Sequence, residues 1–165
     1  RLGKPSIAAI DGPARAGGMT IAVSCDMIVA GESSTFGYPE IDVGLIPGIH
    51  FAHLPRIIGK HRAFELLFSG RSFDAAEAAS LGLVSKIVPD ADVLAEAHKL
   101  ARTFAAKSPE VMRLARAAFG RACDMDYRKN VAEIVEAFCT IASTSDSQEG
   151  VNAFAAKRPP VWKPR

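Results

Sequence analysis

The residues of this sequence whose types and spacing could do chemistry begin with a glycine pair. Gly17 and Gly18 stand between an apolar run at residues 7–10 and a second apolar stretch at residues 19–23. We predict a strand, a glycine turn and a buried helix, so that the first helical turn presents backbone N–H groups without intrahelical partners. Those groups carry partial positive charge, and glycine lets a ligand approach the backbone closely. Such a site suits a negative oxygen.

Several known sites share this outline, and the sequence excludes three of them. A P-loop has Lys and then Ser or Thr after its last glycine, where this chain has Gly18 and Met19. The dinucleotide motif G-x-G-x-x-G and the hydrolase motif G-x-S-x-G are also absent. A close-packed strand–helix turn without any ligand is the remaining alternative to an oxyanion site.

Five motifs in register resemble those of the enoyl-CoA hydratase/isomerase (crotonase) superfamily. They are KPSIAAIDG at residues 4–12, AGG at 16–18, CD at 25–26, FGYPE at 36–40 and GLIPG at 44–48. The resemblance continues to EGVNAFAAKRPP at residues 149–160. It implies an α/β fold: a ββα spiral, of which residues 1–90 would be the C-terminal part, and a helical trimerisation region at residues 91–165. Subunits of this family begin further upstream, so we expect this chain to lack their N-terminal part.

The resemblance also implies an acyl-CoA enzyme that stabilises a thioester enolate with two backbone N–H groups. Gly17 matches one of these donors, and the other belongs to a family loop upstream of Arg1. Glu40 matches an acidic family position and would act as acid and base on the acyl chain. Hydratases carry a second glutamate where this chain has Thr20. A threonine does not act as an acid or base near pH 7, which favours members with one base, such as double-bond isomerases.

The family contacts to coenzyme A match Phe138 and Lys157, and no cofactor is implied beyond the coenzyme A of the substrate. Phe138 also falls in an apolar stripe, so core packing is an alternative for it. Two other functions stay open: a catalytically reduced member that serves as a binding or assembly protein, and a thioester hydrolase or decarboxylase on the same fold.

The segment after residue 48 departs from the family pattern A-G-G-T-Q-R and reads IHFAH. His50 and His53 are spaced i,i+3 and could share one helix face. A metal site needs further ligands, and none is evident nearby, so we expect ordinary pocket or core histidines and no metal. Asp42 would point the same way as Glu40 in an extended segment but not in a turn.

Composition sets wider limits. The 165 residues are 48% hydrophobic and 23% charged, with a formal net charge of +2 that gives no argument for nucleic acid or membrane. No apolar run approaches the about 20 residues of a membrane span. The odd cysteine count, without metal-site spacing, favours a reducing compartment, and we expect the cytoplasm. Apolar stripes at residues 93–104 and 131–142 need partners, and we expect a homotrimer or hexamer.

Overall fold

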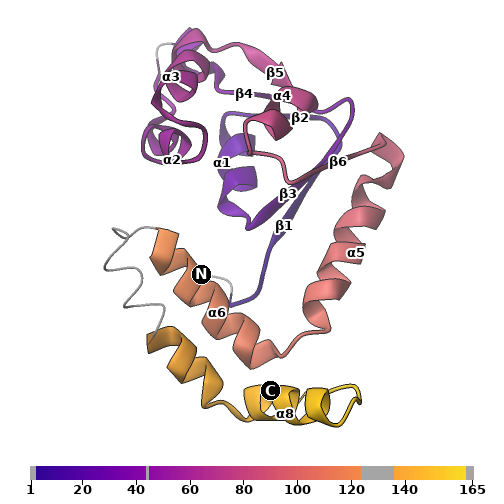
Figure 1. The fold of residues 1–165 in the computed structure, drawn as a ribbon. Helices are drawn as coiled ribbons and strands as arrows, with labels where there is room; N and C mark the ends of the chain where they lie inside the picture. The colour runs from indigo at the N-terminus through magenta and orange to yellow at the C-terminus, as the bar shows by residue number, and fades with distance from the viewer. Residues whose placement is uncertain (1–2, 44, 124–135, 163–165) are drawn as a thin grey trace. The chain divides into compact units, whose positions relative to one another are not determined.

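The computed structural model describes residues 3–43, 45–123 and 136–162 (Figure 1). The chain divides into two compact units, Ser6–Leu100 and the combination of Arg1–Pro5 with Ala101–Arg165. The expected division into residues 1–90 and 91–165, which rests on the family subunit, stays a prediction.

The unit Ser6–Leu100 contains two sheets that share its strands in alternation. One sheet is parallel, in the order β1 (Ile7–Ile10), β3 (Met27–Gly31), β6 (Lys86–Val88). The other has the order β2 (Pro13–Arg15), β4 (Thr35–Gly37), β5 (Ser72–Asp74), with β5 antiparallel to β4. Because β1 and β2 are followed by α1 (Gly17–Ser24), and β3 and β4 start the next turn, the chain winds as a ββα spiral. The α/β fold class is confirmed.

The remaining helices follow in chain order. They are η1 (Pro39–Val43), α2 (Gly48–Ile58), α3 (Lys60–Ser69), α4 (Ala75–Ser80), η2 (Asp90–Asp92), α5 (Val93–Ala105), α6 (Pro109–Cys123) and α8 (Ser145–Ala155); residues 136–142 are also helical. Gly59 separates α2 from α3 with φ 82°, and Gly70 ends α3 in the left-handed conformation. Asp74 followed by Glu77 three residues later predicts a capping box. The structure shows its N-cap half, in which Asp74 accepts a hydrogen bond of 2.7 Å from the Glu77 backbone N–H, while the Glu77 carboxylate pairs with Arg71.

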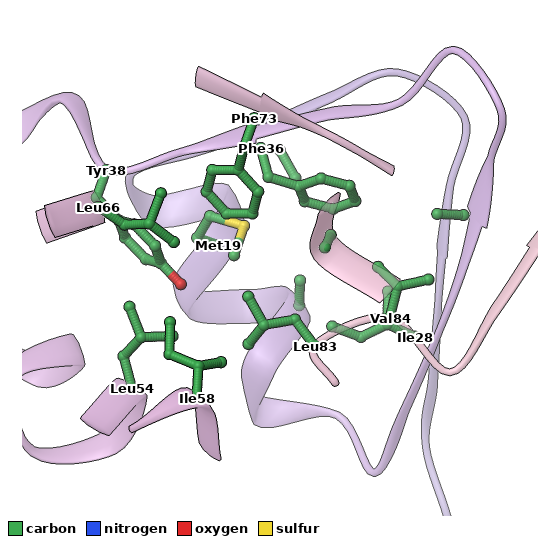
Figure 2. Packing of buried hydrophobic residues seen from close by; sticks show 14 of the residues in the cluster. Met19, Ile28, Phe36, Tyr38, Leu54, Ile58, Leu66, Phe73, Leu83 and Val84 are labelled. Carbon is green, nitrogen blue, oxygen red and sulfur yellow. The ribbon is translucent and has the colours of Figure 1, made fainter. Parts of the chain in front are cut away.

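The apolar core of this unit gathers side chains from α1, the two sheets and helices α2 to α4 (Figure 2). The register of the antiparallel pair places Phe36 opposite Phe73, and their rings stack with centroids 5.7 Å apart. Tyr38 continues the same line and stacks on Phe73 at 6.2 Å. Met19, in the first turn of α1, is buried and packs in this core directly after the glycine turn.

In the other unit, Pro109 after Ser108 predicts the start of a helix, and α6 begins there. Pro109 is the first residue of α6, where its missing N–H costs nothing. The Ser108 hydroxyl accepts a hydrogen bond of 3.1 Å from the Val111 N–H. The same hydroxyl donates to the Asp146 carboxylate at 2.5 Å, and both residues are buried.

The spacing of Asp146 and Glu149 in the sequence predicts a capping box, and this prediction is wrong. Thr144 is the N-cap of α8, and its hydroxyl accepts a hydrogen bond of 3.2 Å from the Ser147 N–H. Asp146 is instead held by its contact with Ser108. Glu149 forms an ion pair of 2.6 Å with Arg158. Both carboxylates therefore pair with side chains elsewhere in the chain, Ser108 and Arg158, and do not cap α8.

The helices from residue 93 onward expose large apolar side chains. Leu94 on α5 is 63% exposed, Phe119 on α6 is 71% exposed and Phe154 on α8 is 87% exposed. The amphipathic stripe at residues 93–104 is confirmed as a helix, while residues 131–135 of the other predicted stripe lie outside the described residues. None of the helices that the structure describes is both long enough and apolar enough to cross a bilayer.

Candidate active site

Strand pairing brings the glycine turn next to the FGYPE segment. The parallel register sets Ala14 beside Phe36 and Arg15 beside Gly37. One residue further, the Ala16 N–H donates a hydrogen bond of 3.3 Å to the Gly37 carbonyl oxygen. The chain then turns into α1 on one side and into η1 on the other. Residues 17–20 and residues 38–40 therefore leave this strand pair at the same end.

The start of α1 is open. Ala16, the N-cap, has φ 48° and ψ −116°, and no side chain caps the helix. Gly17 is exposed, and a Cβ built on it would meet nothing within 4 Å. The predicted strand, glycine turn and helix are confirmed, and the free first turn is the kind of place where backbone N–H groups meet an anionic oxygen. The role of Gly17 as an oxyanion donor stays a prediction.

Thr20 lies one helical turn after Gly17, on the same face of α1, because residues three apart are neighbours on a helix surface. Its hydroxyl oxygen is 3.1 Å from Nε2 of His50, in the first turn of α2. The hydrogen bond is half-buried and joins two residues that are 30 positions apart in the chain. Thr20 is thus paired with an imidazole.

His50 is held in place by its packing. Its side chain is 1% exposed, and its ring lies against the ring of Tyr38 with centroids 4.6 Å apart and an interplanar angle of 57°. Tyr38 is fully buried, and its hydroxyl lies in the apolar cluster with Leu54, Ile58 and Leu66 (Figure 2). Burial, with a smaller contribution from Glu40, raises the pKa of the Tyr38 phenol, so this group is neutral at pH 7.

An unusual set of polar atoms surrounds this pair. Within the described residues, four buried side-chain atoms lack a hydrogen-bond partner: Tyr38 Oη, Glu40 Oε2, His50 Nδ1 and His53 Nδ1. They come from only 16 consecutive positions, residues 38–53. Since the large majority of buried polar atoms in native structures are paired, this concentration marks a place where a ligand or a reacting group is to be expected.

Burial also sets the charge state of the two histidines. It lowers the pKa of His50, while the nearby Glu40 carboxylate raises it and His53 lowers it further. Burial lowers the pKa of His53 as well, with Arg56 acting in the same direction. Both imidazoles are therefore neutral at pH 7. They share α2, as their spacing predicted. Within the described ranges, no group of three or more His, Cys, Asp or Glu side chains could hold a metal ion.

Three other predicted residues have surroundings of their own. Asp42 lies on η1, a 3₁₀-helix with about three residues per turn, so it does not point the same way as Glu40. Its carboxylate oxygens lie beside Gly70, 2.9 Å from where a Cβ would stand. Phe138 and Lys157 belong to the other unit, where Phe138 is 69% exposed and Lys157 is exposed just after α8. Among the described residues of its unit, Phe138 is therefore not packed in a core.

Sequence reasoning did not assign Tyr38 to the site and left His50 among ordinary pocket or core histidines. The signal for His50 was its i,i+3 spacing with His53 together with the departure of residues 49–53 from the family pattern. No local signal connects His50 to Thr20, because their contact depends on how α1 and α2 pack.

Comparison with known proteins identifies the family. The family model described as Enoyl-CoA hydratase/isomerase matches residues 1–165. The chain belongs to this family. It is 40% identical over 163 residues to a probable mitochondrial enoyl-CoA hydratase of Dictyostelium discoideum, covering 98% of this chain and 59% of that protein. It is 37% identical over 163 residues to the 2,3-dehydroadipyl-CoA hydratase of Escherichia coli K12, covering 98% of this chain and 64% of that protein.

Solved structures of the family share the fold. An enoyl-CoA hydratase from Bacillus anthracis superposes with a TM-score of 0.93 at 36% identity, covering 99% of this chain and 64% of that one. An enoyl-CoA hydratase structure from Geobacillus kaustophilus gives a TM-score of 0.93 at 34% identity, with coverage of 99% and 64%. This member of the enoyl-CoA hydratase/isomerase family thus spans about three-fifths of the length of the relatives that it matches.

Proposed function

We propose that the protein is an acyl-CoA enzyme that moves a proton on the acyl chain of an enoyl-CoA thioester. Glu40 is its acid and base, and the Gly17 N–H faces the thioester oxygen. The family membership supports this class of reaction, and the two residues match the family positions for these roles. Whether addition of water or migration of the double bond is the main reaction is decided by the second proton carrier.

The observation that carries the proposal is the state of Glu40. Its Oε2 is buried and has no hydrogen-bond partner among the described residues, so this oxygen is free to take or give a proton. It belongs to the segment that the β2–β4 pairing sets beside the open first turn of α1. A proton next to a thioester carbonyl becomes mobile when donors stabilise the charge that develops on the carbonyl oxygen. The proposal therefore requires Glu40 and the Gly17 N–H to meet one bound thioester from different sides.

Binding of coenzyme A and assembly belong to the same proposal. Phe138 and Lys157 would contact the coenzyme, and both are exposed and accessible to a ligand. The exposed apolar side chains of the helices after residue 93 would be covered in a homotrimer or hexamer, since apolar helix faces of this kind are buried by partners. We also propose that the protein is located in the cytoplasm.

The test compares two carboxylates of η1 in the purified protein. Glu40→Gln keeps the shape of the side chain and removes its proton chemistry, so crotonyl-CoA hydration and 3-enoyl-CoA isomerisation should both fall by ~10²–10⁴. Asp42→Asn is the matched control, because Asp42 lies on the same short helix but beside Gly70. It should retain activity within a few-fold.

The other outcomes separate the alternatives. A wild-type protein that binds acyl-CoA but turns over neither substrate is a catalytically reduced binding or assembly protein. Release of free coenzyme A, detected with a thiol reagent, indicates a thioester hydrolase. Equal losses in Glu40→Gln and Asp42→Asn would contradict the assignment of Glu40.

A further inference from the structure

We propose that His50, acting through the Thr20 hydroxyl, is the second proton carrier of this site. Glu40 and the Thr20–His50 pair would then together serve one water molecule, although the second family glutamate is absent. The inference rests on the proposed function and assigns it a reaction: addition of water to the double bond of an enoyl thioester.

The geometry puts Thr20 on the side of the acyl chain and His50 behind Thr20. Thr20 follows Gly17 by one turn on the same face of α1, so a thioester whose oxygen meets the Gly17 N–H extends its acyl chain past the Thr20 side chain. His50 stands behind Thr20, with Nε2 3.1 Å from Oγ1. A hydroxyl within hydrogen-bond reach of a neutral imidazole is the arrangement in which a weak hydroxyl is made reactive.

The packing of His50 argues against a merely structural histidine. A histidine that only fills a core satisfies both ring nitrogens, whereas here Nδ1 is buried without a partner in the described chain. The ring cannot turn away from Thr20, because it is 1% exposed and lies against Tyr38 at 4.6 Å. The pair is therefore fixed before any substrate arrives.

The groups facing His50 suit a base that is neutral at rest. Burial lowers the pKa of His50 and keeps the imidazole uncharged, and His53 on the same helix acts in the same direction. Glu40 on η1 has the opposite effect and stabilises an imidazolium once it forms. Tyr38 is neutral and adds no charge. His50 can thus accept a proton near pH 7, and the charge that it gains faces a carboxylate.

Atoms and protons balance over the proposed step. The water oxygen forms a bond to C3 of the acyl chain, one water proton passes to Thr20 Oγ1, and the hydroxyl proton of Thr20 passes to His50 Nε2. Before the step, Glu40 takes a proton from solvent. It gives this proton to C2 and is left as a carboxylate. One proton then returns from the His50 imidazolium to Glu40 and restores both starting forms. His50 is a positioning and relay residue, since only Thr20 touches the water.

The experiment measures hydration and isomerisation side by side in wild type, His50→Gln, Thr20→Val and Thr20→Ser. His50→Gln and Thr20→Val should each lower crotonyl-CoA hydration by ~10²-fold or more, while 3-enoyl-CoA isomerisation by Glu40 changes less than tenfold. Thr20→Ser keeps the hydroxyl and should retain hydration within tenfold. The control is His61→Gln, which removes an exposed imidazole on α3 and should leave both activities unchanged.

The pH profile supplies a readout that a structural role would not move. In wild type, kcat for hydration should fall on the acid side with an apparent pKa below 6.5, because protonated His50 no longer accepts a proton. This limb should vanish in His50→Gln and persist in His61→Gln. An acid limb that survives unchanged in His50→Gln would overturn the inference, and so would full hydration activity in Thr20→Val.

Nitrogen NMR of the His50 ring separates this inference from the proposed function. The step requires the ring proton on Nδ1 and a lone pair on Nε2 that accepts from Thr20, so the Nε2 resonance should shift in Thr20→Val and not in His61→Gln. A proton found on Nε2 overturns the relay even if the enzyme hydrates crotonyl-CoA well. If no acyl-CoA is turned over while the Nε2 signal behaves as expected, the proposed function fails and the pair stands.

Discussion

Replacing Gly17 by valine should separate the chemistry of the oxyanion site from its folding. A Cβ at this position would meet nothing within 4 Å, and the φ angle of Gly17 is not in the positive range that favours glycine. The fold therefore accepts a larger side chain here. Because valine is a better helix former than glycine, the free energy of unfolding should stay equal or rise by up to about 0.5 kcal/mol.

Turnover should change in the opposite direction. The open space over Gly17 is the space through which a thioester oxygen would reach the backbone N–H, and two valine methyl groups would fill it. Loss of one oxyanion donor typically costs ~10²–10³ in kcat, or about 2.7–4 kcal/mol of transition-state stabilisation. The two effects thus differ in sign and by several-fold in size, so unfolding cannot be mistaken for loss of the site.

The assay is steady-state turnover of crotonyl-CoA and 3-enoyl-CoA, with chemical denaturation of the same samples. Gly120→Val is the matched control, because Gly120 is an exposed helical glycine with equally open space in the other unit. It should leave turnover unchanged. Proline would be a poor substitute at position 17, since the residue before a proline is confined to extended conformations and Ala16 has φ 48°. If Gly17→Val is stable and turns over within a few-fold of wild type, Gly17 is not a donor.

Three further predictions concern stability, the α6–α8 contact and assembly. Burial holds the pKa of His50 and of His53 below 6.5, so below that pH the folded chain binds fewer protons than the unfolded chain. The free energy of unfolding, measured by denaturation at a series of pH values, should be highest above about pH 6.5 and should fall as pH falls through the folded pKa values. A free energy of unfolding that does not change with pH would contradict this prediction. Asp146→Ala leaves the buried Ser108 hydroxyl without its acceptor and should lower the free energy of unfolding by about 1.5–3 kcal/mol, with a smaller loss in Asp146→Asn; equal stability of wild type and Asp146→Ala would show that the pair contributes nothing. Light scattering at micromolar concentration should show a trimer or hexamer, and a stable monomer would refute the assembly.

The sequence alone determined the features that depend on neighbouring residues. Gly17 and Gly18 marked the turn before α1, the Asp74–Glu77 pair marked the start of α4, and Pro109 marked the start of α6. Each of these follows from backbone geometry or capping within one turn of helix. The order of the motifs likewise indicated the family, because the motifs keep their spacing along the chain.

Only the tertiary structure decided which of these residues meet. The capping box at Asp146 failed because a buried hydroxyl far along the chain offered that carboxylate a better partner than its own helix. Strands β2 and β5 have three residues each, too few for an alternating pattern of apolar and polar residues to predict them from the sequence. Both form because they pair with β4. The pairing of Thr20 with His50 arises in the same way, since it joins two helices through side chains 30 positions apart. Such contacts depend on packing in three dimensions, which a one-dimensional pattern of residue types does not contain.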